Sequence, residues 1–175
     1  MRNRQALYRE RSGKVIRAIN KDDIPACVQV IRTGFQTVAD AFGFTAENAP
    51  RFTAFATTKE SLLQQMDDKH RQMFAYFTED GEIVGYYALH FLPHRICELN
   101  QLCVLPTCRH HGFGADLLND AFQRARDAGC RKMNISIVEE NKQLRTWYEY
   151  YGFVHTGTKK FEFFPFTCGY MEKEL

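Results

Sequence analysis

The sequence predicts a mixed α/β domain built on a largely antiparallel sheet. Residues 73–78 and 83–91 are rich in β-branched and aromatic residues and flank an Asp80-Gly81 turn, which is the pattern of an antiparallel hairpin. A helical pattern over residues 112–128 is followed by an apolar run over 132–138, and a strand–helix–strand order favours one parallel crossover. Antiparallel hairpins and one parallel step together indicate the mixed class.

Composition indicates one domain with an apolar core. The chain has 175 residues, of which 45% are hydrophobic, and a formal net charge of +2. A chain of this size needs no disulfide or metal for stability, and so small a charge does not indicate a nucleic-acid partner. We assign residues 14–175 to this domain and residues 1–13 to a solvated N-terminal leader. The longest apolar run, residues 83–92, is too short to span a membrane, so we expect a cytoplasmic protein.

The cysteines are expected to be reduced and mostly buried. None of the six forms a Cys-x-x-Cys pair, and no histidine stands at a zinc-binding spacing from them. The sequence therefore predicts no metal site.

The N-terminal third begins as a strand followed by a helix. Residues 14–19 alternate as a strand does, and Asn20 then caps a helix with acidic residues and Pro25 in its first turn, running toward Arg32. Residues 35–66 are aromatic but less regular, with a helix expected over 59–67. We interpret this segment as a lid over a pocket.

The rest of the chain continues the sheet. A third strand over residues 96–105 follows the hairpin, and Gly129 ends the helix of residues 112–128. After the strand over 132–138, a short helix over 141–151 ends at Gly152. Two last strands, 153–163 and 168–174, turn at Pro165.

The loop between the strand ending at Pro106 and the following helix has the pattern of a phosphate cradle. Its sequence is Arg109-His110-His111-Gly112-Phe113-Gly114. Glycines let a ligand approach the backbone, and the first amides of a helix have no intrahelical acceptor. A dinucleotide fingerprint is excluded because Leu117 stands where a third small residue is needed, and a P-loop is excluded because its Gly-Lys-Ser/Thr is absent. A lone Gly-x-Gly can also be a simple turn before a helix.

Three segments, taken in order, resemble the GNAT superfamily of N-acetyltransferases. They are Leu99-Asn100-Gln101-Leu102-Cys103-Val104-Leu105-Pro106, Arg109-x-x-Gly112-x-Gly114, and Asn141 with Trp147-Tyr148-Glu149-Tyr150-Tyr151-Gly152-Phe153. The resemblance covers most of the chain from Lys14 onward. It implies a central sheet of about seven strands with splayed middle strands, flanked by about four helices, and acetyl-CoA as acyl donor.

The resemblance also implies where acetyl-CoA binds. Its pyrophosphate would lie on the backbone amides of the loop and helix start, which belong to His110, His111, Gly112, Phe113, Gly114 and Ala115. Arg109 would grip a phosphate in a forked geometry. The pantetheine arm would pair with the backbone of Leu102, Cys103 and Val104 as an added strand does. Asn141 would steady this arm, and a helix N-cap is an equally good role for it.

The chemistry needs a general base and a group that assists the departing sulfur, and the sequence offers candidates for both roles. Glu98 stands where the histone-acetylating branch of the superfamily has a catalytic carboxylate, so the resemblance implies a general base, although strand glutamates are also common as exposed edge residues. His90 and His94 are the rival bases. Tyr148 occupies the position of the family tyrosine that protonates the departing CoA sulfur, although a tyrosine on a short aromatic helix also fits a core position.

The leading hypothesis is an N-acetyltransferase that acts on a primary amine of a small molecule or peptide by direct attack in a ternary complex. Cys103 and Cys108 lie near the cofactor segments and leave a covalent acetyl-enzyme as a less favoured route. We expect the acceptor between residues 35–55 and the last hairpin, where further phenylalanines cluster. The same aromatics could instead close the core or join a homodimer. The alternative function is a non-catalytic acyl-CoA sensor or partner-docking module.

Overall fold

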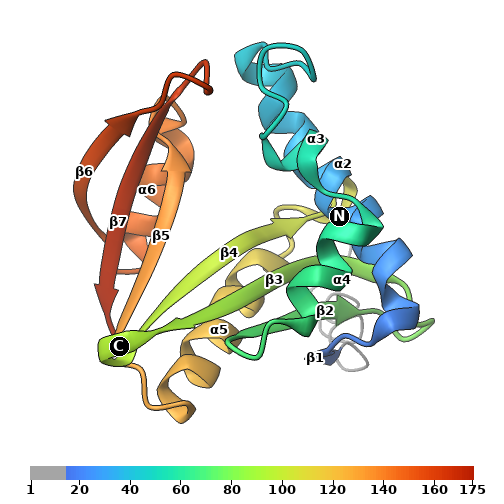
Figure 1. Cartoon of the computed structure of the whole chain (residues 1–175). Coiled ribbons are helices and arrows are strands. Elements are labelled where there is room, and N and C mark those ends of the chain that lie inside the picture. The colour runs from blue at the N-terminus through green and yellow to red at the C-terminus, as the bar shows by residue number, and fades with distance from the viewer. Residues whose placement is uncertain (1–14) are drawn as a thin grey trace, which may run out of the picture.

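The fold is organised around one seven-stranded sheet in the order β1-β2-β3-β4-β5-β7-β6, shown in Figure 1. This computed structural model describes residues 15–175, so the predicted leader and Lys14 lie outside the described residues. All neighbouring strands pair antiparallel except β4 and β5, which are parallel. The predicted fold class is confirmed. The strands are β1 (Val15–Ala18), β2 (Arg71–Phe77), β3 (Ile83–Leu92), β4 (Ile96–Val104), β5 (Lys132–Val138), β6 (Val154–Lys160) and β7 (Thr167–Glu174).

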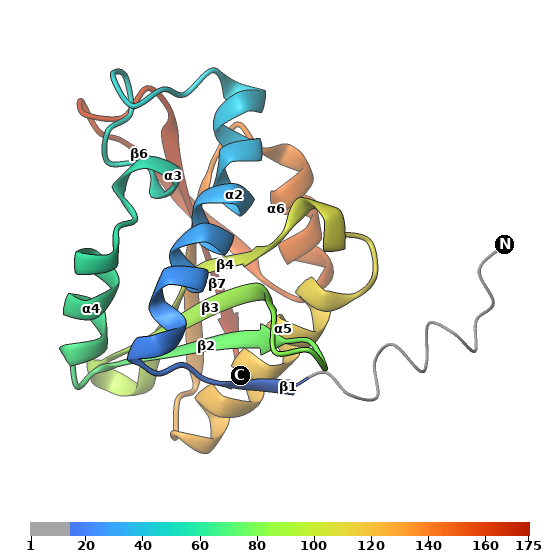
Figure 2. The same ribbon diagram turned by 90° about the vertical axis from the view of Figure 1, so that its right-hand side faces the viewer.

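Helices cover both faces of the sheet (Figures 1 and 2). On one face, α2 (Ile24–Phe42) and α4 (Lys59–Asp67) pack on the half formed by β2, β3 and β4. On the other face lie α5 (Phe113–Asp127) and α6 (Lys142–Tyr150). Short elements complete the described chain: α3 (Thr53–Ala56) and the 3-10 turns η1 (Lys21–Asp23), η2 (Pro93–Arg95) and η3 (Pro106–Cys108). Within residues 15–175, no helix is both long enough and apolar enough to cross a membrane.

The first long helix corrects the expectation that residues 35–66 are irregular from their start. Helix α2 continues past Arg32 to Phe42 and ends at Gly43, whose φ of 69° is left-handed. Phe35 and Val38 are modest helix formers, which is why the sequence pattern weakens there. Gly34 and Ala39 are buried on the packed side of the helix, and tertiary packing of that face outweighs local propensity.

The last hairpin is shorter than predicted on its first strand. Strand β6 ends at Lys160, whereas the prediction ran to residue 163, and β7 begins at Thr167. The loop between them supplies aromatic side chains to a buried cluster that also contains Phe44 and Phe52. In this cluster, the ring of Phe166 lies 4.9 Å from that of Phe44 and 5.8 Å from that of Phe52.

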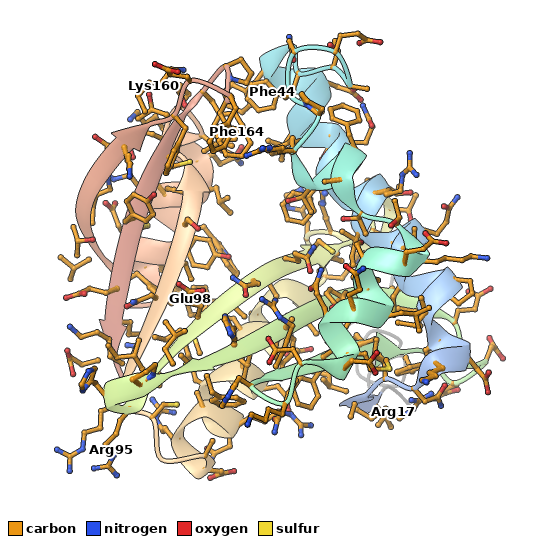
Figure 3. The ribbon with its side chains drawn as sticks, viewed as in Figure 1. Arg17, Phe44, Arg95, Glu98, Lys160 and Phe164 are labelled. Atoms are coloured by element: carbon orange, nitrogen blue, oxygen red, sulfur yellow. The ribbon has the colours of Figure 1, made fainter. Side chains whose placement is uncertain are left out.

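This aromatic cluster joins the segment that follows α2 to the loop between β6 and β7. Figure 3 shows Phe44 and Phe164 where the loop after β6 meets the segment after α2. Phe44, Phe52 and Phe166 are each at most 7% exposed. These three rings therefore close the core, which was the alternative interpretation of the aromatic segments. The position of the acceptor stays a prediction. Aromatic pairs of this geometry stabilise the closed junction.

The cysteines agree with the sequence analysis. All six are free thiols, and all but Cys108 are buried. The expectation of reduced and mostly buried cysteines is confirmed.

Candidate functional site

The centre of the sheet is split between β4 and β5. The two strands pair only from Ile96 opposite Lys132 to Glu98 opposite Asn134, and β5 then pairs with β7 up to Val138. Beyond Glu98 the strands diverge, as Figure 1 shows, so within residues 15–175 no strand pairs with the edge of β4 that is turned toward β5. An extended amide chain can pair with such an edge. The splayed middle strands implied by the resemblance are confirmed.

A bulge in β4 lies beside this split. Gln101 has a φ of 55°, and the register with β3 shifts so that Tyr86 pairs with Cys103 while Ala88 pairs with Asn100. Bulges re-aim backbone groups and are frequent next to active sites. The bulge precedes Leu102, Cys103 and Val104, the backbone positions expected to bind pantetheine. No motif in the sequence predicts this bulge.

The predicted cradle is a tight turn that leads into α5. Gly112 is the N-cap of the helix and has a φ of 88°, which a side chain would strain. Gly114 lies in the first turn, and a Cβ placed there would meet Trp147 at 3.7 Å, an ordinary contact. Packing therefore does not require a glycine at position 114.

Arg109 is engaged with the protein itself. Its Nε donates to the carbonyl of Val104 at 3.2 Å, Nη1 to the Thr37 hydroxyl at 2.9 Å and Nη2 to the carbonyl of Gly34 at 2.8 Å. The guanidinium therefore ties the cradle loop to β4 and to α2. The phosphate contact of this side chain stays a prediction, whereas its structural role is observed.

Tyr148 reaches the split from α6. It is 6% exposed, and its ring packs 4.9 Å from Trp147 and 5.3 Å from Phe153. Its phenol lies within electrostatic range of the Cys103 thiol on β4. Burial raises the pKa of Tyr148 above its ordinary range, so the phenol keeps its proton. The core position that a tyrosine on a short aromatic helix predicts is confirmed. Its role toward the CoA sulfur stays a prediction.

Glu98 lies at the last position where β4 and β5 pair, near the point at which they diverge (Figure 3). Its Oε2 is 3.7 Å from His90 Nδ1, and His90 Nε2 is 3.7 Å from Asp68 Oδ2. Glu98 and its rival His90 are thus neighbours on adjacent strands. His94 is instead exposed in η2, the turn between β3 and β4.

A cavity of about 270 Å³ opens beside Glu98. Its lining combines two carboxylates with amide and hydroxyl groups from four strands. The residues are Glu98, Asn100, Asn134, Ile135, Ser136, Thr156, Tyr170, Met171 and Glu172. Apart from Glu98 and Asn100, the sequence analysis did not single these positions out. The alternation of Asn134 and Ser136 with buried Met133, Ile135 and Ile137 was the available signal, because it marks a strand with one polar face.

Asn141 is the N-cap of α6. Its side-chain oxygen accepts a hydrogen bond from the Leu144 amide at 3.2 Å. The capping role is confirmed. The contact of its side chain with pantetheine stays a prediction.

Comparison with known proteins gives a consistent picture. The profile of the acetyltransferase (GNAT) family matches residues 40–153. The uncharacterized N-acetyltransferase YjgM of Escherichia coli is 28% identical over 144 residues, which cover 81% of this chain and 82% of YjgM.

Solved structures with the same fold span nearly the whole chain. The PaiA N-acetyltransferase of Thermoplasma acidophilum, in complex with coenzyme A, has a TM-score of 0.79 at 19% identity and covers 93% of this chain and 99% of its own. A chimera of the spermidine N-acetyltransferase SpeG from Vibrio cholerae has a TM-score of 0.70 at 16% identity, with 93% and 96% coverage.

Proposed function

The chain belongs to the acetyltransferase (GNAT) family and is an N-acetyltransferase with acetyl-CoA as acyl donor, and from this premise we propose the residues that perform the transfer. In our proposal Glu98 is the general base and Tyr148 assists departure of the CoA sulfur. The acceptor is a primary amine of a small molecule or peptide, held in the cavity beside Glu98. The observation that carries the proposal is the split between β4 and β5. Glu98 lies where the strands diverge, and Tyr148 is buried in the core that α5 and α6 form with the sheet, close enough to Cys103 on β4 for an electrostatic interaction.

The residues of the split fit the parts of acetyl-CoA. The N-terminus of α5, with Gly112 as its N-cap and Gly114 in its first turn, would hold the pyrophosphate. The free edge of β4 at Leu102, Cys103 and Val104 would pair with the pantetheine arm. When bound, acetyl-CoA supplies a thioester carbonyl as the electrophile.

Glu98 would make the amine nucleophilic. An alkyl amine has a pKa of about 10.4, so at neutral pH it is almost wholly protonated and unreactive. Glu98 accepts the ammonium proton, directly or through water, as the nitrogen attacks the carbonyl carbon. A backbone amide between Leu102 and Val104 donates to the oxygen that gains negative charge. The carbon–sulfur bond then breaks and the sulfur leaves as thiolate. The nitrogen loses its remaining extra proton to solvent or to that thiolate, which gives the neutral amide.

Tyr148 would stabilise that thiolate. Because burial raises the pKa of its phenol, complete proton transfer to sulfur is unfavourable, and a hydrogen bond from the phenol is the better description. Burial also raises the pKa of Cys103 to about 12, so this cysteine is a poor nucleophile. Direct attack by the amine is therefore favoured over a covalent acetyl intermediate on Cys103.

The test combines binding and turnover. Acetyl-CoA is titrated into the protein by calorimetry, and a panel of amines and peptides is screened for release of the CoA thiol. Tyr148→Phe is expected to bind acetyl-CoA like the parent and to turn over about a hundredfold more slowly, the size of one lost transition-state donor. Binding without thiol release across the panel would instead support the acyl-CoA sensor or docking module. No binding would overturn the assignment of the cradle.

A further inference from the structure

The proposed base stands at one end of a line of three titratable side chains. Glu98 on β4 is in register with His90 on the adjacent strand β3, and its Oε2 lies 3.7 Å from His90 Nδ1. The other ring nitrogen, Nε2, lies 3.7 Å from Oδ2 of Asp68, in the loop between α4 and β2. The imidazole therefore lies between two carboxylates, one of which lines the acceptor cavity.

The loop that carries Asp68 is fixed by backbone hydrogen bonds. The His70 amide donates to Asp68 Oδ1 at 2.9 Å, and the Arg71 amide donates to the Asp68 carbonyl at 2.9 Å. The His70 carbonyl accepts at 2.7 Å from the amide of Phe91, the residue that follows His90. Asp68 is thereby attached to the strand that carries His90, with Oδ1 held by the loop and Oδ2 facing the ring.

Asp68 stays ionised beside the ring. The hydrogen bond from the His70 amide holds the pKa of Asp68 below its usual range, and nearby His90 makes a smaller contribution in the same direction. An ionised carboxylate accepts hydrogen bonds and cannot donate one. It therefore favours the imidazole tautomer that carries its proton on Nε2, and this tautomer turns the lone pair of Nδ1 toward Glu98.

The remaining charged and titratable groups near His90 come from β2 and the same loop. Arg71 is the register partner of His90 on β2, so their side chains share a face of the sheet. The Arg71 guanidinium donates to the side-chain oxygens of Asn100 and Gln65, at 3.0 and 3.4 Å. His70 is exposed in the loop. An arginine keeps its charge at every pH of interest, so pH acts on this group through the histidines and the carboxylates.

We propose that Asp68 is a positioning residue for the transfer and acts through His90. In this proposal Asp68 orients the imidazole so that Nδ1 accepts a hydrogen bond from the carboxyl of Glu98, once that carboxyl has taken the proton of the amine. The proton then passes from the carboxyl oxygen to Nδ1, which restores the Glu98 carboxylate, and the imidazolium releases it to solvent. This proposal rests on the proposed function, because it deepens the role of Glu98 as the base.

The geometry leaves room for these contacts to form. Both separations of 3.7 Å exceed a hydrogen bond by less than about 1 Å. Contacts of catalytic groups commonly shorten when the substrate binds. The His90 side chain is 28% exposed, so its ring can turn slightly without displacing the core.

The first measurement is the tautomer of His90, which requires no acceptor. Nitrogen NMR of the isotopically labelled histidine rings is recorded at a pH where they are neutral, and the His90 signal is assigned by its loss in His90→Gln. We expect the proton on Nε2 in the parent. In Asp68→Asn the His70 amide holds the side-chain oxygen at the Oδ1 position, so the NH2 group faces Nε2 as a donor. We therefore expect the ring proton of this variant on Nδ1.

The second measurement is turnover of the amine or peptide of the panel that releases the CoA thiol fastest. We expect Asp68→Asn to lower kcat at least about tenfold, with the KM of the acceptor and the affinity for acetyl-CoA little changed, because the base is retained without its partner. The acid limb of kcat/KM should move to lower pH, because an N–H at Nδ1 stabilises ionised Glu98. Asp67→Asn removes the neighbouring exposed carboxylate and is the matched control, which should change none of these quantities.

A double-mutant cycle separates positioning through His90 from a structural role of Asp68 in its loop. In a His90→Gln background, Asp68→Asn should cost nothing further in kcat, because the imidazole transmits its effect. A structural role would instead lower kcat equally in both backgrounds. Thermal melts verify that each variant is folded.

Three results would overturn this proposal while leaving the proposed function intact. They are a proton on Nδ1 of His90 in the parent, an unchanged kcat in Asp68→Asn, and an equal fall in kcat when Asp68→Asn is made with and without His90. Full activity of Glu98→Gln would instead contradict the proposed function itself. A protein that binds no acetyl-CoA and acetylates no amine would contradict it as well.

Discussion

The two sides of the split offer a ligand different kinds of chemistry. The cradle and the free edge of β4 offer backbone groups, and the polar side chains beside them are already engaged: Arg109 holds α2, and Asn141 caps α6. The cavity beside Glu98 offers side chains from four strands, two of them carboxylates. In our proposal the side that binds the cofactor is thus defined by shape, and the side that binds the acceptor by side-chain chemistry.

This difference implies that the two binding functions can be separated by mutation. A backbone site is damaged by added atoms and is largely indifferent to neighbouring side-chain chemistry. A side-chain site is damaged by conservative changes such as Glu to Gln, which keep the shape and remove the charge. Acetyl-CoA affinity and amine turnover should therefore respond to different substitutions.

The largest effect is expected for Gly114→Glu. Its Cβ fits beside Trp147, but its carboxylate would lie at the helix N-terminus where the pyrophosphate is expected. We expect calorimetry to show at least a hundredfold weaker binding of acetyl-CoA, about 3 kcal/mol. Gly114→Ala is the control and should be as stable as the parent or up to about 1 kcal/mol more stable, since alanine favours the helix. Unchanged affinity in a folded Gly114→Glu protein would mean that the loop is only a turn.

Glu98→Gln tests the acceptor side. We expect kcat to fall about a hundredfold while acetyl-CoA affinity stays the same, because a general base is lost and the backbone site is untouched. His90→Gln is the comparison, since His90 touches Glu98 and Asp68 but does not line the cavity. Rates measured from acidic to alkaline pH distinguish the two bases. A larger loss in His90→Gln than in Glu98→Gln would transfer the role to the histidine.

Arg109→Leu tests whether the loop depends on its side chain. The substitution removes three hydrogen bonds to Gly34, Thr37 and Val104. We expect the free energy of unfolding to fall by about 2 kcal/mol, as for the loss of several bonds to a charged group. Thr37→Val removes one of these bonds and should cost less. A loss of acetyl-CoA affinity without a loss of stability would instead identify Arg109 as a phosphate ligand.

The turn and helix start proposed to hold the cofactor could be predicted from the sequence because their signals are local. Gly112, Gly114 and the start of α5 stand next to one another in the chain, and the spacing of these residues alone specifies a turn that opens a helix. The hairpin around Gly81 and the parallel step from β4 to β5 were predictable for the same reason.

Apart from Glu98, the residues of the proposed acceptor side could not be predicted, because they meet only through the sheet register. Asn134 and Glu172 are 38 positions apart and become neighbours only because β7 pairs antiparallel with β5. Phe44 and Phe166 likewise meet across the fold, and the sequence could not distinguish a buried junction from an acceptor pocket. Arg109 had two good partners, a phosphate or the α2 backbone, and only the length of α2 brings Thr37 within its reach.

The smallest effect on stability is expected for a substitution of Glu139. Its side chain links the end of β5 to β6 and to α6. Its Oε2 accepts from His155 on β6 at 2.9 Å, and its Oε1 accepts from Arg145 and Lys142 of α6. Burial alone would raise the pKa of Glu139, but the hydrogen bonds from His155 and Lys142 outweigh it and hold this pKa below its usual range.

A carboxyl whose folded pKa is depressed stabilises the fold above its unfolded pKa, and this contribution is lost as pH falls through the folded value. Glu139→Gln should therefore lower the free energy of unfolding by about 1 kcal/mol at neutral pH and by progressively less in acid. Denaturant unfolding across that range measures it. Glu149→Gln is the control, because Glu149 pairs with Arg145 alone at 43% exposure and should change stability less. A loss in Glu139→Gln that is the same at every pH would show that Glu139 acts by packing, and the charge network would then not be what fastens β6 and α6 to the end of β5.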